Sequence, residues 1–177
     1  MQRIGLLSDT HGHLDAAVFS HFGDCDEVWH AGDIGNAAVS DALSAVKPFR
    51  AVHGNVDGPD LRAVFPEVLH WRCEDLSVLM LHIGGRPGRY PPAALRELRR
   101  FRPGLFVTGH SHILRIERDA SLDCLHVNPG AAGLQGWHRV RTIVRFTVDG
   151  GRLRDLEVVE LMPRRPSAGP DPTIPHR

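Results

Sequence analysis

The sequence predicts an α/β fold built on a largely parallel sheet flanked by helices. Strand-like and helix-like segments alternate through the first half of the chain, a rhythm typical of parallel strands joined by helical crossovers. Short polar clusters directly follow several apolar runs, and in open sheets of this kind sites form beyond the carboxyl ends of the strands. The length of 177 residues suits one domain that can bury a substantial core.

The first half of the chain contains three expected strands and two expected helices. In the first helix, Leu14, Val18 and Phe22 recur at i, i+4 and i+8, which is the spacing of one helical face. The strands are short and mainly apolar. In order, the expected elements are strand Arg3–Ser8, helix Leu14–Phe22, strand Glu27–His30, helix Ala37–Val46 and strand Phe49–Val52.

The second half reads mainly as β-structure. Segments Val68–Cys73 and Ser77–Ile83 are expected to form a hairpin. A helix is expected over Pro91–Phe101, because it begins with proline and carries one apolar stripe among its arginines. The remaining expected strands are Leu105–Thr108, Ile113–Glu117, Cys124–Val127, Arg139–Val148 and Arg152–Leu161, the last two joined by a turn at Asp149-Gly150-Gly151.

Alternation within Arg139–Val148 predicts two distinct faces. The apolar face would carry Val140, Val144, Phe146 and Val148, and the other face Arg139, Arg141 and Arg145. We interpret the arginine face as solvated, because no aromatic residues interleave with it to stack nucleic-acid bases. The formal net charge of zero also argues against a long nucleic acid or an acidic membrane surface as the main partner.

Cysteine usage and terminal composition indicate a cytoplasmic protein. Cys25, Cys73 and Cys124 are far apart and odd in number, which suggests reduced thiols. No signal-peptide pattern is evident at the N-terminus, and no apolar run approaches the roughly 20 residues of a membrane helix. Pro163–Arg177 holds five prolines and few apolar residues, so we expect a disordered tail after a domain spanning residues 1–162.

Polar residues gather in five short segments, each after an apolar run. Residues two apart on an extended segment point the same way, so Asp9 and His11 can face one cation. Each segment alone is weak evidence, because glycine and aspartate are also common in turns. Carboxylates and imidazoles collected at strand ends without a thiol are the ingredients of a hydrolytic metal centre. The segments are Asp9-Thr10-His11, Gly32-Asp33, Gly54-Asn55-Val56-Asp57, His82 and Gly109-His110-Ser111-His112.

Histidine is abundant, with 12 in the chain, and about half are expected to be ordinary surface or core residues. The residues expected to be ordinary in this sense are His70, His126, His138 and His176.

The order and surroundings of the polar segments carry a family resemblance. The surroundings include Leu7-Ser8-Asp9-Thr10-His11-Gly12, His30-Ala31-Gly32-Asp33 and Asn128-Pro129-Gly130. In the five polar segments and these neighbouring residues, the chain resembles calcineurin-like metallophosphoesterases, most of all the small prokaryotic phosphodiesterases that form a single domain. The resemblance runs from Gln2 to about Leu161. It implies a four-layer α/β/β/α sandwich of two mixed sheets flanked by helices, with a dinuclear metal site at the strand carboxyl ends.

The resemblance also implies a ligand set for two divalent metal ions. Carboxylate, amide and imidazole donors suit manganese, iron, zinc, nickel or cobalt better than Cu(I) or an all-oxygen magnesium or calcium cage. Manganese is the favoured ion of this group. The implied ligands are Asp9, His11 and His112 for one metal, Asn55, His82 and His110 for the second, and Asp33 as the bridge.

The implied activity is hydrolysis of a small phosphodiester. Two cations about 3.5–4 Å apart would lower the pKa of a bridging water, and the resulting hydroxide would attack phosphorus in line. Two divalent ions balance Asp9, Asp33, one hydroxide and a singly charged diester, whereas a monoester dianion leaves excess negative charge. The alternatives are a phosphomonoesterase, a nuclease, or a non-catalytic metal-binding scaffold, because a retromer subunit of this fold binds proteins.

Val56 departs from the pattern of the wider superfamily. Many members have histidine directly after the asparagine, where it is thought to protonate the leaving group. Valine cannot donate a proton, so general acid catalysis, often worth roughly 10²–10⁴ in rate, is lost or moved elsewhere. Asp57, His13 and His53 are the candidate replacements, and no catalytic side chain is otherwise assigned.

The glycine-rich segment between His82 and the next helix has two interpretations. It is either a plain flexible loop or a substrate-gating loop in which Arg86 or Arg89 contacts phosphate. Exposed edge strands in the β-rich half would also permit a homo-oligomer.

Overall fold

The alternating segments of the first half form the parallel part of one sheet. In this computed structural model, which describes residues 1–161, β1 (Gln2–Leu7), β2 (Glu27–His30) and β3 (Phe49–Ala51) pair in parallel in that order. Two C-terminal strands, β9 (Arg141–Asp149) and β10 (Arg152–Leu161), extend the sheet antiparallel beyond β1. The predicted parallel core and the C-terminal hairpin are both confirmed.

The second sheet is also mixed. Its strand order is β4-β5-β6-β8-β7, with β5, β6 and β8 parallel and the two edge strands antiparallel. The predicted hairpin is confirmed, although Leu76 belongs to the second strand instead of the turn. The strands are β4 (Val68–Cys73), β5 (Leu76–Leu81), β6 (Leu105–Val107), β7 (Leu114–Asp119) and β8 (Cys124–Pro129).

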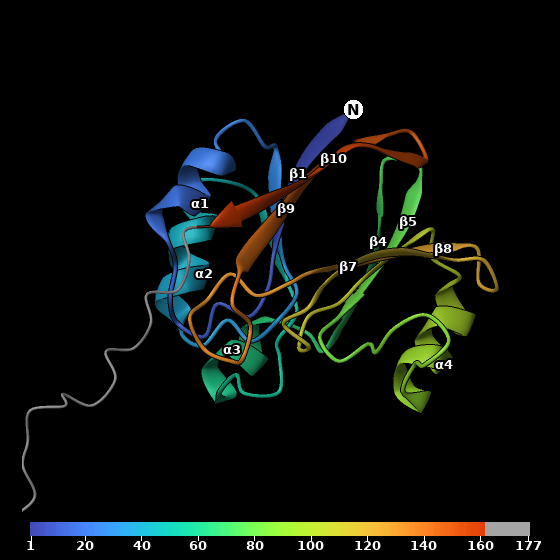
Figure 1. Cartoon of the computed structure of the whole chain (residues 1–177), viewed down its shortest axis with the longest axis horizontal. Coiled ribbons are helices and arrows are strands. Elements are labelled where there is room, and N and C mark those ends of the chain that lie inside the picture. Colours follow the sequence, from blue (N-terminus) through green and yellow to red (C-terminus); the bar gives the residue numbers. More distant parts are fainter. Residues whose placement is uncertain (162–177) are drawn as a thin grey trace, which may run out of the picture.

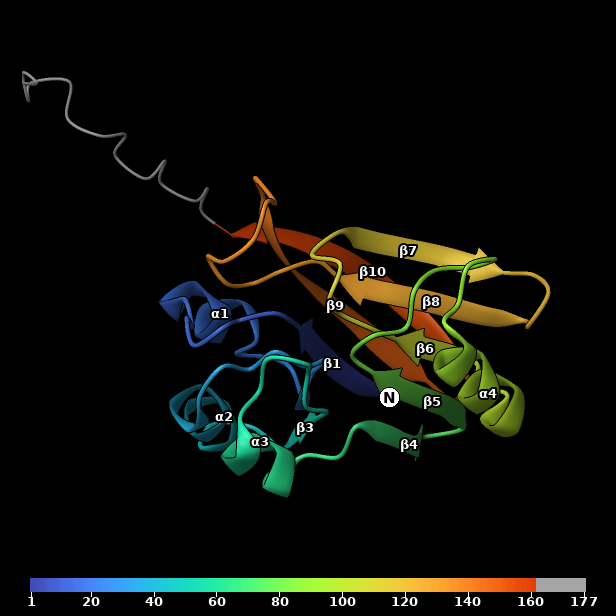
Figure 2. The same ribbon diagram turned by 90° about the horizontal axis from the view of Figure 1, so that it is seen from below.

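Helices cover the outer face of each sheet, and Figure 2 shows the resulting layers. Helices α1 (Ala16–His21), α2 (Ala37–Ser44) and α3 (Pro59–Val64) lie beside the first sheet, and α4 (Pro92–Phe101) lies beside the second (Figure 1). Within residues 1–161 no helix is long and apolar enough to cross a membrane. The tail predicted at 163–177 lies outside the described residues, so the domain limit at 162 stays a prediction.

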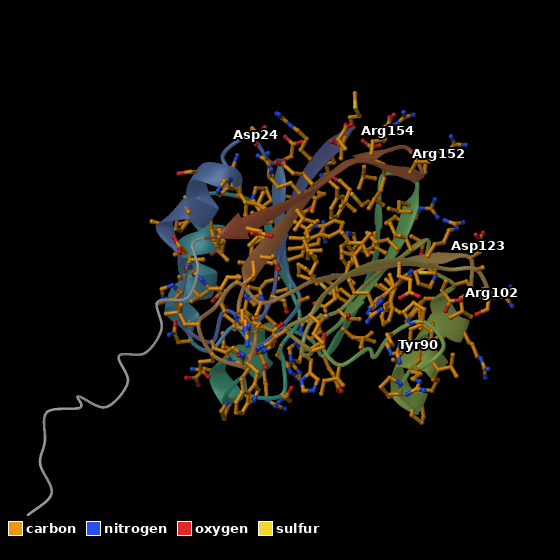
Figure 3. The ribbon with its side chains drawn as sticks, in the orientation of Figure 1. Asp24, Tyr90, Arg102, Asp123, Arg152 and Arg154 are labelled. Carbon is orange, nitrogen blue, oxygen red and sulfur yellow. The ribbon has the colours of Figure 1, made fainter. Side chains whose placement is uncertain are left out.

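Three apolar clusters bind the four layers together. One fills the space between the sheets and includes Ile4, Trp29 and Phe146. A second joins the first sheet to its helices, and a third joins the second sheet to α4 through Leu98. Figure 3 shows the side chains packed between the sheets, with charged residues such as Arg152 at the periphery. The four-layer α/β/β/α fold is therefore confirmed.

The interpretation of the arginine face as solvated is wrong for Arg141, whereas Arg145 is half-buried and Arg139, which precedes β9, is exposed as expected. Arg141 is only 3% exposed and donates to the Asp15 carboxylate at 2.8 Å, while Arg145 donates to the His21 carbonyl at 2.8 Å. Helix α1 covers this face at Arg141 and Arg145, and an arginine is rarely buried unless a carboxylate pairs with it, as Asp15 does here. The prediction for Val140 is also wrong, because it precedes β9 and is 46% exposed.

Helix α3 was not predicted. It is six residues long, and only Leu61 among them is buried, so no helical periodicity shows in the sequence. Pro59 occupies the first turn, where the missing proline N–H has no intrahelical partner to lose. The helix matters because it begins four residues after Asn55 and supplies Arg62 to the site described next.

Candidate metal centre

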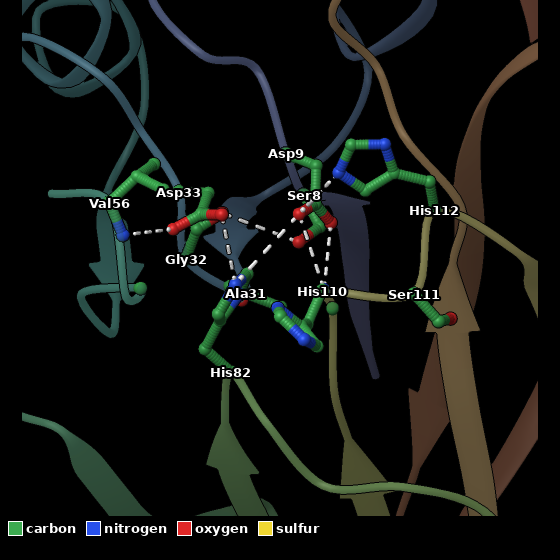
Figure 4. A network of polar contacts seen from close by, with 12 residues as sticks. Ser8, Asp9, Ala31, Gly32, Asp33, Val56, His82, His110, Ser111 and His112 are labelled. Carbon is green, nitrogen blue, oxygen red and sulfur yellow. Dashed lines mark hydrogen bonds and ion pairs between the residues drawn. The ribbon is translucent and has the colours of Figure 1, made fainter. Parts of the chain in front are cut away.

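The predicted ligands converge at one edge of the two sheets, as Figure 4 shows for most of them. The loops after β1, β2 and β3 come from the first sheet, and those after β5 and β6 come from the second. The loops are tied to one another, because the Asp9 amide donates to the Gly32 carbonyl and the Gly109 amide to the His82 carbonyl, both at 3.0 Å. The seven residues brought to this edge are Asp9, His11, Asp33, Asn55, His82, His110 and His112.

One group consists of Asp9, His11 and His112. Their ligand atoms all lie within 4.8 Å of one another. The His112 Nε2 atom is 3.2 Å from Asp9 Oδ1 and also 3.2 Å from His11 Nε2. This is the first of the two predicted metal-binding groups, and its three side chains are within reach of a single ion.

The second group consists of Asp33, His82 and His110, again with ligand atoms within 4.8 Å. The His82 Nε2 atom is 3.1 Å from Asp33 Oδ2, and the same oxygen is 3.9 Å from His11 Nε2 in the first group. Asp33 thus lies between the groups, as a bridging ligand must. Asn55 is exposed, and together with His82 it lines a cavity that is described below. The role of Asn55 as a metal ligand stays a proposal.

The hydrogen bonds of His82 fit a bound cation. Its Nδ1 atom is 2.7 Å from the Ala31 carbonyl, which can only accept, so Nδ1 carries the proton. In the neutral ring the buried Nε2 atom then has a lone pair and no hydrogen-bond partner, and it faces the Asp33 carboxylate. Two electron-rich atoms this close repel unless a positive charge lies between them. A divalent ion of the manganese-to-zinc group is chemically suited to both donors.

The protonation tendencies of the site suit metal binding. Burial alone would raise the pKa of Asp33, but the hydrogen bond and charge that a protonated His82 supplies in the absence of metal, with the Val56 amide, bring that pKa below its usual range. Burial lowers the pKa of His110, which favours the neutral imidazole that a metal requires. The contact with Asp9 raises the pKa of His112, so a positive charge is stabilised at this position.

The backbone around the site is unusual. A left-handed conformation costs a non-glycine residue roughly 1–2 kcal/mol, and such strain concentrates at functional sites. Five of the seven candidate ligands adopt it, with φ angles of 55° (Asp9), 48° (His11), 54° (Asp33), 68° (His110) and 57° (His112). The fold holds these residues in place through inter-loop bonds such as His11 N to the Asp33 carbonyl at 2.9 Å.

Substitution of Gly54 by alanine is expected to eliminate metal binding at the Asp33 side of the site. A Cβ atom at Gly54 would lie 2.0 Å from Asp33 Oδ1 and 2.3 Å from the Asp33 amide nitrogen, so the Asp33 carboxylate would have to move. Gly58→Ala is the matched control, because nothing lies within 4 Å of a Cβ there. Metal titration of both variants checks this, and equal metal content in the two would contradict it.

A cavity of about 320 Å³ opens beside Asn55 and His82. Its lining includes His53, Arg62 and Arg96. Arg62 is held by the loop that carries Asn55, since its guanidinium donates to the Asp57 carbonyl at 2.6 Å and to the Asn55 carbonyl at 2.9 Å. Sequence reasoning missed Arg62 and Arg96, because neither lies near a recognisable motif.

The predicted substrate arginines lie elsewhere. Arg86 and Arg89 close a tight turn, with the Arg89 amide donating to the Arg86 carbonyl at 2.8 Å. Among the described residues, the lining of the cavity beside Asn55 does not include either of them. Their predicted contact with phosphate therefore has no support from this geometry.

The three candidate proton donors differ in their surroundings. The Asp57 carboxylate is buried and accepts from the amides of Ile34, Gly35 and Gly54 at 2.7–3.1 Å, so it shapes the loop and is occupied as an acceptor. His53 lines the cavity, whereas His13 lies in the loop after β1 and does not line it.

The histidines expected to be ordinary divide into two kinds. His126 is buried against Thr108 and His70 is exposed, as expected, while His176 lies outside the described residues. His138 is different, because its Nδ1 atom lies 3.3 Å from Nδ1 of His112. The expectation for His138 stays a prediction, and the contact with His112 gives a reason to consider another role for it.

Two packed mixed sheets with carboxylate and imidazole groups along one edge are the architecture of a metallophosphoesterase. The family model of the calcineurin-like phosphoesterase superfamily domain matches residues 2–151, and the chain belongs to that superfamily. It is 31% identical over 134 residues to a probable metallophosphoesterase of Methanocaldococcus jannaschii, which covers 72% of this chain and 67% of that protein.

Solved structures share the fold at lower sequence identity. An archaeal phosphodiesterase has a TM-score of 0.71 with 22% identity, covering 90% of this chain and 99% of that one. Vps29 of Chaetomium thermophilum also has a TM-score of 0.71, with 18% identity and coverage of 91% and 97%. At these identities the likeness establishes the fold alone, so the activity has to be argued from the site.

Proposed function

We propose that this protein is a metal-dependent phosphodiesterase that hydrolyses a small phosphodiester. The observation that carries the proposal is Asp33, whose Oδ2 atom lies between His82 at 3.1 Å and His11 at 3.9 Å and so connects two ligand groups. A cavity opens directly beside these groups, where one ester substituent of a substrate can lie. Membership of the calcineurin-like phosphoesterase superfamily supports phosphoesterase activity.

The proposed roles of the site residues are binding of two metal ions and support of the loops that carry the ligands. Asp9, His11 and His112 would hold one ion, and Asn55, His82 and His110 the second, with Asp33 between them. Two bound divalent ions would activate water and neutralise charge on the phosphate. The Val56 amide donates to Asp33 Oδ1 at 3.0 Å and fixes the orientation of that carboxylate. Arg62 keeps the Asn55 loop in place and adds positive charge to the cavity wall.

The charge of the site favours diesters over monoesters. Asp9 and Asp33 contribute two negative charges, and a hydroxide with a singly charged diester brings the total to four, which two divalent ions balance. A monoester dianion exceeds that balance by one charge. Manganese as the favoured ion and a cytoplasmic location belong to this proposal as well.

A non-catalytic scaffold is the second candidate function. Vps29 has the same fold, and Val56 is 55% exposed at a position where a proton donor would be expected. A scaffold has no need of two neighbouring groups of potential metal ligands, however, and two groups of three such side chains support the enzyme. We therefore favour the phosphodiesterase over the scaffold.

Hydrolysis of bis(p-nitrophenyl) phosphate tests the proposal. Metal-stripped protein should be inactive, and restoring manganese, nickel, zinc or magnesium one at a time should recover turnover with at least one ion. p-Nitrophenyl phosphate serves as the monoester comparison and should react more slowly. If the protein binds metal but turns over neither ester with any ion, the scaffold becomes the better explanation.

A further inference from the structure

His138 lies against the side of His112 that faces away from the first ligand group. The two imidazole rings are 5.1 Å apart between centroids and inclined at 75°. The Nδ1 atoms of the two rings are 3.3 Å apart, and the other ring nitrogen of His138, Nε2, is 3.1 Å from the Gly133 carbonyl. A chain of three groups therefore runs from a backbone carbonyl through His138 to His112.

The Gly133 carbonyl fixes the direction of the hydrogen bonds in this chain. A carbonyl oxygen only accepts, so His138 donates from Nε2 and, as a neutral imidazole, accepts at Nδ1. His112 must then donate from its own Nδ1 to His138. The lone pair of His112 is left on Nε2, which is the nitrogen 3.2 Å from Asp9 Oδ1. This is the tautomer that a metal ligand needs.

His82 in the second group shows the same arrangement with a simpler partner. There the Ala31 carbonyl accepts directly from Nδ1 at 2.7 Å, and Nε2 faces Asp33. In the first group, His138 takes the place of that carbonyl. Metal-ligating histidines usually donate their second ring N–H to such a partner, and losing the partner typically weakens metal binding 10–100-fold.

The backbone of the same loop closes over His112. A Cβ atom at Gly136 would lie 2.2 Å from Nδ1 and 2.7 Å from Cε1 of His112, and the φ angle of Gly136 is +111°. The Gly136 backbone thus covers one side of the His112 Nδ1 atom. If the His112 Nδ1–H group lost its acceptor here, the unsatisfied donor would destabilise this tautomer of His112, or the ring would adopt the other tautomer.

We propose that His138 is a positioning residue that orients His112 and keeps its Nε2 atom available to the metal held by Asp9, His11 and His112. The inference rests on the proposed metal centre and concerns only its first group. It predicts that the two metal sites respond differently to loss of His138, because the second group relies on Ala31.

The test compares His138→Leu and His138→Ala, which remove the acceptor, with His138→Asn, whose side-chain oxygen can still accept. Cobalt affinity is measured by competition with a chromophoric chelator, and the visible spectrum of the bound cobalt reports the ligand geometry. We expect one of two sites to weaken 10–100-fold in the leucine and alanine variants, the other site to be unchanged, and asparagine to restore most of the loss. His70→Leu, an exposed histidine in β4, is the control.

Three outcomes separate the possibilities. Unchanged affinity at both sites in the leucine and alanine variants overturns the role of His138. Equal weakening in the asparagine variant also overturns it, since packing of the ring and not its acceptor would then matter. If the unaltered protein binds no metal, the proposed metal centre itself is overturned. The unaltered protein is measured first, so this outcome is distinguished from a failure of the inference about His138. Circular dichroism of the metal-free variants confirms that they are folded.

Discussion

Asp33→Asn is expected to reduce metal-dependent hydrolysis of bis(p-nitrophenyl) phosphate by roughly 10³-fold or more, since the Asp33 carboxylate is proposed to bind the metals of both ligand groups. Asparagine keeps the shape of aspartate, and its oxygen can still accept from the Val56 amide, which lies 3.0 Å from Asp33 Oδ1. What disappears is the negative charge facing His82 Nε2 at 3.1 Å. The loss of activity in Asp33→Asn therefore reports the contribution of the negative charge and of the proposed bridging role, because packing changes little.

The measurement has two parts, the kcat/KM at saturating metal and the number of ions bound per chain. Asp41→Asn is the matched control, because Asp41 is exposed on α2, away from the ligand loops. The control should keep full activity and full metal content. A variant at Asp33 that retained a tenth of the activity would rule out a bridging role for this carboxylate.

The gathering of the seven candidate ligands at one edge could be predicted from the sequence, because each lies within five residues of the end of a strand. The position of Asp9 or Asp33 is set by the strand before it, and the carboxyl ends of neighbouring parallel strands meet at one edge. Local pattern and chain order identified the polar segments. The resemblance to a family then supplied the assignment of ligands to two metals and the four-layer arrangement, which periodicity alone does not determine.

Other parts of the site depend on contacts that leave no local signal. His138 meets His112 across 26 positions of sequence, through a loop with no regular structure. Arg62 reaches the Asn55 carbonyl from a helix of only six residues. Arg141 was expected in solvent because its strand alternates, but alternation says nothing about what covers each face, and here α1 does.

The rate of hydrolysis is expected to depend steeply on the leaving group, because Val56 offers no proton to the departing oxygen. Nitrophenolate leaves without protonation, whereas an alkoxide needs a general acid worth roughly 10²–10⁴ in rate. Among the residues considered as replacements, Asp57 is occupied by three backbone amides. A series of aryl and alkyl diesters measures the dependence. Equal rates for nitrophenyl and alkyl diesters would show that a proton donor exists elsewhere.

Val56→His is expected to raise the rate for poor leaving groups by about 10²-fold and to change little for nitrophenyl esters. The Val56 side chain is 55% exposed, so an imidazole fits without repacking, and the backbone amide that binds Asp33 is retained. Val64→His is the control, since Val64 is an exposed valine on α3. A uniform gain across the series, or a gain in the control, would mean that the histidine acts through charge or metal binding. A gain confined to poor leaving groups would show that the missing proton donor limits this site.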